Sequence, residues 1–263
     1  VAVDDLANEN LRWETTAQLN VGTDISFFNS RISLTADYYV MTTRDLLLER
    51  PLPEYVGLRN PVQIQNIGEI ENRGIELTLS TYNLTGELDW TTDFNFSRNR
   101  NKILTLPDGE DIIIGSAPGH FLIGETQILR EGEPLGVFYG YVYDGVIQVG
   151  EQVPTGAGFE TDPGGEQYRD IGTFNDAGEL VAEPDGQLSS ADRQIIGDPN
   201  PDFIWGLNNT LRYKGFDLNV FIQSAIGGDI LSYTLMELDV MAGADNATTA
   251  ALDRWSPSNP NTD

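Results

Sequence analysis

The feature that most constrains this chain is an alternation of apolar and polar residues that recurs in six long segments. In each segment one set of alternate positions is apolar and the other is polar, which is typical of β-strands with one buried face. We expect strands over about residues 12–27, 32–48, 71–82, 87–100, 203–213 and 216–226. Soluble strands usually span about five or six residues, whereas a tilted membrane-spanning strand needs about 9–11. The length of these segments therefore favours strands that cross a bilayer.

Aromatic residues and turns support the same interpretation. Aromatic side chains recur near the strand tips, as in the interfacial girdles of membrane barrels: Trp13, Phe27, Phe28, Tyr38, Tyr82, Trp90, Tyr213 and Phe216. Short connections at 29–30, 83–86 and 214–215 alternate with long polar stretches at about 43–70 and 101–202. If all short turns lie on one side, both long stretches lie on the other, which is the arrangement of outer-membrane β-barrels.

Two soluble alternatives stay open at this point. A secreted, acidic β-sandwich that serves in binding or adhesion has the same alternation, and it predicts shorter strands and solubility without detergent. Asn209 favours this alternative, because it lies on the apolar face of its strand. A jelly-roll glycosidase predicts hydrolysis that is lost when one carboxylate is changed, but the abundant acidic residues give no specific catalytic pair.

The composition excludes several classes of function. The chain has 41 Asp and Glu against 15 Lys and Arg, a formal net charge of −26, and nucleic acid is a poor partner because a cationic stripe is absent. Without cysteine there is no disulfide, thiolate nucleophile or Cys-ligated zinc site. The single histidine, His120, has no nucleophile motif near it, so we assign it no catalytic role and expect no enzyme.

The long polar stretches are expected to form external loops. Residues 144–202 are strongly acidic, with Arg169 and Arg193 as their only basic residues, and we interpret the acid excess as an adaptation to high salt. A short helix is expected after Gly227-Gly228, with Asp229 as its cap, and another over about 247–255.

One segment, residues 185–192, is a candidate calcium site. It resembles the second half of a calcium-binding loop, because Asp185 precedes Gly186 and Asp192 stands six residues after that glycine. The positions where earlier ligands should stand hold Val181 and Glu183. A turn stabilised by its own aspartate hydrogen bonds is the alternative.

Several motifs then resemble one family. They follow one another along almost the whole chain: residues 10–16 (NLRWETT), 37–39 (DYY) with 43–47 (TRDLL), 66–77 (NIGEIENRGIEL), 132–141 (GEPLGVFYGY), 191–197 (ADRQIIG), 213–218 (YKGFDL) and 254–260 (RWSPSNP). Each motif alone is weak, but the ordered set is strong. Together they resemble the later barrel portion of SusC/RagA-type TonB-linked outer-membrane proteins.

The resemblance implies an all-β fold that is part of a large antiparallel transmembrane barrel of about 22 strands. It also implies a plug domain, a TonB box and a SusD-like surface lipoprotein. We expect neither plug nor TonB box within residues 1–263. Six strands are too few to close a barrel, for which about eight is the minimum, so we expect this chain to be part of a larger one.

The expected function is import of oligomeric nutrients, glycans or peptides, across the outer membrane of a Gram-negative, Bacteroidetes-like bacterium. The TonB system would supply energy through the plug, no substrate bond would change, and no cofactor is needed. The substrate itself cannot be read from the sequence. Strand residues that face away from lipid should line the lumen: Glu14, Asp37, Glu76, Asp89, Asp93 and Asp217.

Overall fold

A computed structural model describes residues 7–52, 62–66, 68–115, 125–174, 180–239 and 246–260. The chain divides into two compact units. The first unit comprises Val1–Ile112, Leu129–Gly136 and Pro199–Asp229. The second comprises Ile113–Ile128, Val137–Asp198 and Ile230–Asp263.

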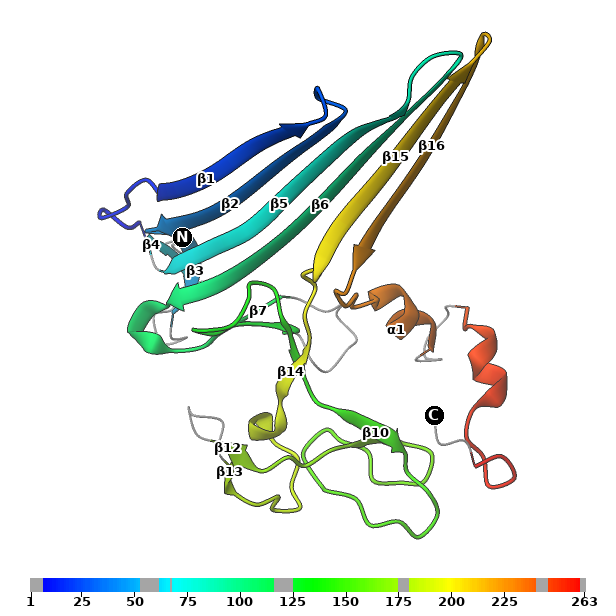
Figure 1. The fold of residues 1–263 in the computed structure, drawn as a ribbon. Helices are drawn as coiled ribbons and strands as arrows, with labels where there is room; N and C mark the ends of the chain where they lie inside the picture. Colours follow the sequence, from blue (N-terminus) through cyan, green and yellow to red (C-terminus); the bar gives the residue numbers. More distant parts are fainter. Residues whose placement is uncertain are drawn as a thin grey trace. The chain divides into compact units, whose positions relative to one another are not determined.

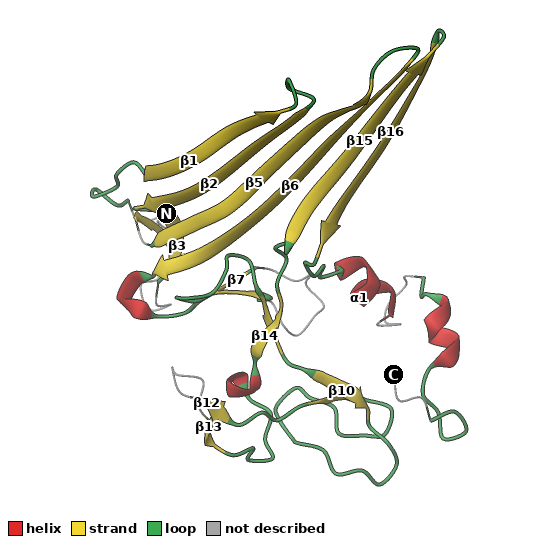
Figure 2. Cartoon of the chain, viewed as in Figure 1, coloured by secondary structure: helices red, strands yellow, loops and turns green. Residues whose placement is uncertain are grey.

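The first unit is built on one antiparallel sheet of six long strands in the order β1-β2-β5-β6-β15-β16 (Figures 1 and 2). The strands are β1 (Thr15–Phe27), β2 (Ile32–Arg44), β5 (Glu69–Leu84), β6 (Leu88–Thr105), β15 (Phe203–Tyr213) and β16 (Phe216–Ile226). Each strand pairs with the next in this order. The expectation of an antiparallel, all-β sheet is confirmed.

Short connections lie at one end of the sheet, where Figure 1 shows the β1–β2, β5–β6 and β15–β16 turns together. The β15–β16 turn is the tightest, because Tyr213 pairs directly with Phe216. Its two central residues, Lys214 and Gly215, have φ angles of 47° and 86°. Positive φ at both positions defines the hairpin turn whose twist matches the flanking strands. The long connections leave from the opposite end of the sheet.

Two strand ends differ most from the expected ranges, while the other ends lie within three residues of them. The strand expected to reach residue 48 ends at Arg44, because Asp45 has a φ of 57° and its carbonyl accepts a hydrogen bond from the Asn66 amide (2.8 Å). The chain then forms a separate hairpin of β3 (Leu47–Pro51) and β4 (Val62–Asn66). The fourth long strand continues past residue 100 to Thr105, which pairs with Glu69.

The register places one kind of side chain on each face of the sheet. In each strand the alternate positions that are mostly apolar lie on one side of the sheet, which we call the apolar face. They include Leu19, Leu77, Phe96 and Trp205. Many of its side chains are exposed, including Leu19 (63%) and Phe216 (80%). A β-sandwich would bury such a face against a second sheet. Within the described part of the chain the apolar face keeps its exposure, as a lipid-facing surface does.

Asn209 is the polar exception on the apolar face, and the structure gives its side chain partners. Its Oδ1 accepts hydrogen bonds from Trp90 Nε1 (3.0 Å) and Thr92 Oγ1 (2.7 Å). Asn83 Nδ2 also donates to Thr92 Oγ1 (2.7 Å) and Thr81 Oγ1 donates to Asn83 Oδ1 (3.0 Å). The network lies near the short turns, where an interfacial tryptophan needs a partner for its N–H. Asn209 is therefore compatible with a membrane wall.

Three glycines on the opposite, polar face each lie directly across from a larger side chain. Gly22 pairs with Asp37, Gly74 with Tyr39, and Gly206 with Asn95. A Cβ at position 74 would lie 2.6 Å from Tyr39 Cζ, and one at position 206 would lie 2.8 Å from Asn95 Oδ1. In each pair the neighbour's side chain occupies the space above the glycine, so these positions exclude larger residues.

The second unit consists of short elements around a small core of its own. They are β7 (Ile112–Ile114), β8 (Gln127–Leu129), β9 (Phe138–Gly140), β10 (Tyr143–Val146), β11 (Glu166–Tyr168), β12 (Thr173–Phe174), β13 (Leu180–Ala182), β14 (Gln194–Gly197) and the 3-10 helix η3 (Ser190–Asp192). A small sheet has the order β14-β9-β8-β7. Ile128, Val137, Ile147 and Leu188 are almost fully buried. The expected long loop is thus an organised region.

The two helices expected near the end of the chain are present but shorter. They are α1 (Tyr233–Asp239) and the 3-10 helix η4 (Thr249–Asp253), and a further 3-10 turn, η2 (Pro107–Gly109), follows β6. Ser232 takes the place expected for Asp229 as the cap, since its Oγ accepts from Leu235 N (3.3 Å). Among the described residues, none of the helices has the length and apolar character needed to cross a membrane, a result that does not bear on strands.

An aromatic cluster in the second unit surrounds Tyr168. Its ring centroid lies 5.9 Å from that of Tyr141 and 5.7 Å from that of Phe159. Burial raises the pKa of Tyr168 above its ordinary value of 10.0, and the hydrogen bond from its hydroxyl to Glu166 raises the pKa further. The neutral phenol is thus the form that suits this folded environment.

The Gly206–Asn95 pair gives a double-mutant prediction. Replacing Gly206 by alanine should destabilise the full-length protein by about 1–3 kcal/mol, because the new Cβ would press on the Asn95 amide. In an Asn95→Ala background the same change should cost little. Urea unfolding, followed by the mobility shift of the folded barrel on gels, measures both costs. An equal cost in the two backgrounds would contradict the contact.

Tyr168 gives a prediction about alkaline pH. Its pKa is higher in the folded than in the unfolded state, so the stabilisation is complete below about pH 10 and is lost as pH rises toward the folded-state pKa. Absorbance titration of tyrosinate should show a late-titrating component that Tyr168→Phe removes. Tyr213→Phe, at an exposed turn, is the control and should leave that late-titrating component in place.

Candidate functional site

The polar face of the sheet is the candidate functional surface. Among the residues expected to line a lumen, Asp37, Glu76, Asp89, Asp93 and Asp217 all have the parity of this face. Glu14 immediately precedes β1, and its carboxylate accepts a hydrogen bond from the Leu47 main-chain N–H (2.8 Å). The structure thus brings five of these carboxylates to one side of the sheet, while their position in a lumen stays a prediction.

The middle of the polar face carries a pair of facing acids. Asp37 on β2 lies directly opposite Glu76 on β5. Asp24, on the neighbouring β1, accepts a hydrogen bond from Thr35 Oγ1 (2.6 Å). Like charges directly opposite each other destabilise a sheet. This pair is therefore a feature that packing alone does not favour, and it gives the face a local negative potential.

The acids near the short turns have structural partners. Arg212 pairs across the sheet with both Asp89 and Asp217, and its Nε lies 3.2 Å from Asp217 Oδ1. Asp89 Oδ1 accepts a hydrogen bond from Gly86 N (3.0 Å), which closes the β5–β6 turn. These two acids stabilise hairpins, so they are weaker candidates for contact with a solute than Asp37 and Glu76.

Asp93 lies between the facing acids in the middle of the polar face and the acids near the short turns. Its Oδ1 accepts a hydrogen bond from Ser80 Oγ (2.7 Å) on β5. On the other side it pairs with Asn208, whose buried Oδ1 has no hydrogen-bond partner among the described residues. The carbonyl oxygen of Asn208 is thus an unpaired acceptor that is shielded from a solute on this face.

An array of asparagines occupies the long-loop end of the polar face, and the sequence reasoning missed it. Tyr39 OH donates to Asn99 Oδ1 (3.0 Å), and Asn99 Nδ2 lies 3.4 Å from Asn72 Oδ1. Asn101 Nδ2 donates to Asn200 Oδ1 (2.8 Å). The signal that could have revealed the array is the run of alternate asparagines in β6. Amides both donate and accept, which suits hydroxyls and peptide groups equally.

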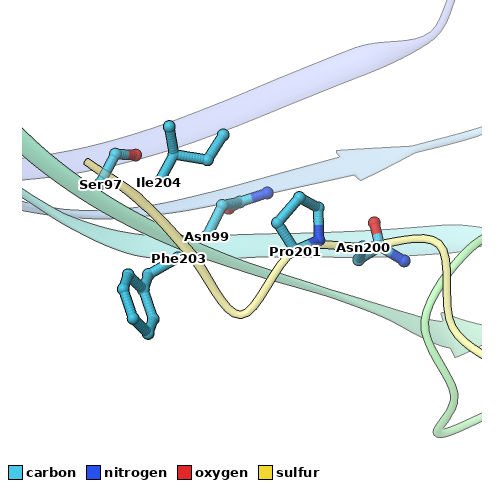
Figure 3. Close-up of a pocket in the computed structure, with 6 residues that line it drawn as sticks. All are labelled: Ser97, Asn99, Asn200, Pro201, Phe203 and Ile204. Carbon is cyan, nitrogen blue, oxygen red and sulfur yellow. The ribbon is translucent and has the colours of Figure 1, made fainter. Parts of the chain in front are cut away.

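A small hollow lies beside this array. Figure 3 shows its lining: Ser97 and Asn99 belong to β6, Asn200 and Pro201 precede β15, and Phe203 and Ile204 begin β15. Its volume is about 80 Å³. Sites for drug-sized ligands measure about 300–1,000 Å³. The hollow therefore fits one end of a larger ligand at most, and the array is better regarded as an open surface.

The candidate calcium segment forms a hydrogen-bonded turn. Asp185 Oδ1 accepts from Gln187 N (2.8 Å), and Asp192, which is 3% exposed, accepts from Ser189 N (2.8 Å) and Ile171 N (3.2 Å). The segment thus has the aspartate turn expected as the alternative. Over the described ranges no group of three or more acidic or histidine side chains could hold a metal. Calcium at Asp185 and Asp192 stays a prediction.

The single histidine, His120, lies outside the described residues.

Arg193 has a structural role in the second unit. It follows the buried Asp192, lies over the Tyr139 ring at 4.6 Å and donates to the Glu125 carbonyl (2.7 Å). These contacts explain part of the sequence motif at 191–197 as a structural element of the second unit.

Comparison with known proteins places the chain in a family. A family profile described as "TonB dependent receptor-like, beta-barrel" matches residues 2–175. TonB-dependent receptor P3 of Formosa agariphila is 52% identical over 267 residues, which cover 100% of this chain and 25% of that protein. TonB-dependent receptor SusC of Bacteroides thetaiotaomicron is 28% identical over 251 residues, covering 93% of this chain and 22% of SusC.

Solved structures agree on the fold. A structure of the RagAB peptide transporter matches with a TM-score of 0.73 at 23% identity, covering 99% of this chain and 27% of the matched chain. This chain spans about a quarter of the length of the relatives it matches. The long exposed strands, the separation of polar and apolar faces and these similarities lead to one conclusion: the chain belongs to the TonB-dependent receptor β-barrel family and is SusC-like.

Proposed function

We propose that this chain forms part of the barrel wall of a SusC-like, TonB-dependent importer of oligomeric nutrients in the outer membrane of a Gram-negative, Bacteroidetes-like bacterium. The observation that carries the proposal is a six-stranded sheet whose apolar face stays exposed while its other face is polar. TonB-dependent receptor β-barrels are outer-membrane proteins. In such a setting lipid covers the apolar face and the polar face borders the lumen.

The sheet contributes positioning and polarity rather than covalent chemistry. Among the described residues β1 and β16 are the edge strands of the sheet, and lipid does not tolerate unpaired backbone groups. Strands from other parts of the full-length protein therefore pair with them. The importer would draw its energy from the TonB system, and no step would make or break a substrate bond. Relatives of the family are receptors in transport, which accords with the expectation that the chain is not an enzyme.

The substrate we propose is an oligomer of sugars or amino acids, held jointly with a SusD-like lipoprotein. Two features support this class. The asparagine array offers many donors and acceptors on an open surface, which suits a long chain of hydroxyl or amide groups better than a compact ligand. The matched solved structure is described as the RagAB peptide transporter, and a peptide is an oligomer of amino acids.

The assignment of faces predicts a contrast between neighbouring residues. The chain has no cysteine, so single cysteines can be placed at Thr78 on the polar face and Leu77 on the apolar face. In the full-length protein, with any cysteines elsewhere replaced by serine, Thr78→Cys should react with a water-soluble maleimide. Leu77→Cys should resist it, and a fluorophore attached there under denaturing conditions should be quenched by brominated lipid after refolding. The opposite pattern would favour a soluble sandwich.

The transport function predicts dependence on two partners. Cells that carry the full-length protein should take up a labelled glycan or peptide oligomer, and uptake should fall to background when TonB is deleted. Deleting the neighbouring SusD-like lipoprotein should lower uptake at low oligomer concentration. Surface abundance of the barrel, measured by antibody, is the control. Uptake at the full rate without TonB would contradict the importer.

A further inference from the structure

The basic residues of this acidic chain are unevenly distributed. Five of the 15 Lys and Arg residues lie together at the long-loop ends of three adjacent strands, and we call them the basic cluster: Arg44 on β2, Arg73 on β5, and Arg98, Arg100 and Lys102 on β6. In a chain with a formal net charge of −26, such a concentration of positive charge calls for a physical explanation.

The register places the whole basic cluster on the apolar face of the sheet. Arg98 lies opposite Ile75, one pair beyond Leu77 and Phe96, where the apolar band ends. Arg73 and Arg100 form the next pair, directly opposite each other. Lys102 pairs with Glu71, and Arg44 with Glu69, further out. The first charged residues of β5 and β6 above the apolar band are therefore arginines.

The acidic residues nearby neutralise only part of the positive charge of the basic cluster. Arg44 lies 3.0 Å from Glu69, and Arg100 lies 2.5 Å from Asp202. Arg73 lies 3.9 Å from Glu71, and its side chain is 62% exposed. Arg98 and Lys102 are exposed and have no acidic partner in the described part of the chain. Two facing arginines repel each other unless an anion lies between them.

The height of the basic cluster matches the edge of a bilayer core. Along β6 the apolar face runs from Leu88 at the short turn to Arg98, ten residues later. At about 3.3 Å per residue this is roughly 33 Å, and a strand tilt of about 40° reduces it to about 25 Å across the membrane. An apolar band of a membrane barrel is about 25 Å tall, so the arginines lie at the depth of lipid head groups.

The two ends of the apolar face differ in chemistry. At the short-turn end it closes with aromatic residues, among them Trp90, Tyr213 and Phe216. At the long-loop end β5 and β6 close with guanidinium groups, while an exposed tryptophan, Trp13, precedes β1. Aromatic rings suit any interface, whereas guanidinium groups bind phosphate through two parallel hydrogen bonds. The guanidinium groups of β5 and β6 therefore suit an anionic ligand on the long-loop side.

We propose that the basic cluster binds the phosphate group of a phosphorylated lipid in the membrane leaflet on the long-loop side, with Arg73 and Arg98 as its principal ligands. The lipid's acyl chains would lie along the apolar face below, beside Ile75, Leu77 and Phe96. This role goes beyond nutrient import, because it concerns the outer surface of the wall and needs no substrate.

The test uses the purified full-length protein and a soluble, short-chain phosphatidic acid, with short-chain phosphatidylcholine and inorganic phosphate for comparison. Native mass spectrometry or calorimetry should show the phosphatidic acid bound about tenfold more tightly than either. The double change Arg73→Gln with Arg98→Gln should weaken this binding about tenfold. Arg212→Gln, on the polar face, is the matched control and should leave it unchanged.

Three results would overturn the proposal. Inorganic phosphate that binds as tightly as phosphatidic acid would indicate a site for a free anion. An equal loss in Arg212→Gln would indicate general electrostatic attraction. Unchanged binding in the double variant would exclude the basic cluster as the site. Should the double variant fail to fold, Arg98→Gln alone makes the same comparison, because Arg98 has no ionic partner in the described residues.

Discussion

The hydrogen-bonded register of the six long strands is the constraint on which the rest of the first unit depends. Backbone groups in lipid have to be paired within the protein, and an antiparallel ladder pairs them. Because side chains alternate, the same register decides which residues meet lipid and which border water. A shift of one residue would move Asp37 and Glu76 to the apolar face and Leu77 to the polar one.

That register also explains features with no obvious local cause. Gly206 has no unusual backbone angle that requires glycine, yet the ladder places it beneath the Asn95 amide. The Asn209 side chain has partners on β6 only because the ladder brings Trp90 and Thr92 alongside it. Side chains that look misplaced in one strand are satisfied by the next, which is how a sheet accommodates polar groups on an apolar face.

Much of the fold could be predicted from the sequence because one face of each strand has a constant environment. Alternation is strong where lipid and water lie on opposite sides, as from Leu88 to Phe96. It disappears above the apolar band, where Arg98, Arg100 and Lys102 take the positions of the apolar set, and so the continuation of β6 to Thr105 was missed although its hydrogen bonds continue. The break at Asp45 was missed because its backbone angle leaves no mark on hydropathy.

The candidate site was predictable only in part. Parity alone was enough to place Asp37, Glu76 and Asp93 on one face. The asparagine array depends on which strands are neighbours, because Tyr39, Asn72 and Asn99 belong to three different strands. A single sequence does not give that adjacency. The cap of α1 was missed for a similar reason: Ser232 and Asp229 are both good caps, and only the position of the Leu235 amide distinguishes them.

The buried residues of the second unit have a consequence for how such proteins diverge. Ile128, Val137, Ile147 and Leu188 give this unit a core that is separate from the ladder of the long strands. Exposed positions around that core can change without altering the pairing of strands that insertion in the membrane requires. Homologues can therefore differ in this region, and so in their surface properties, while the long strands keep the same pairing.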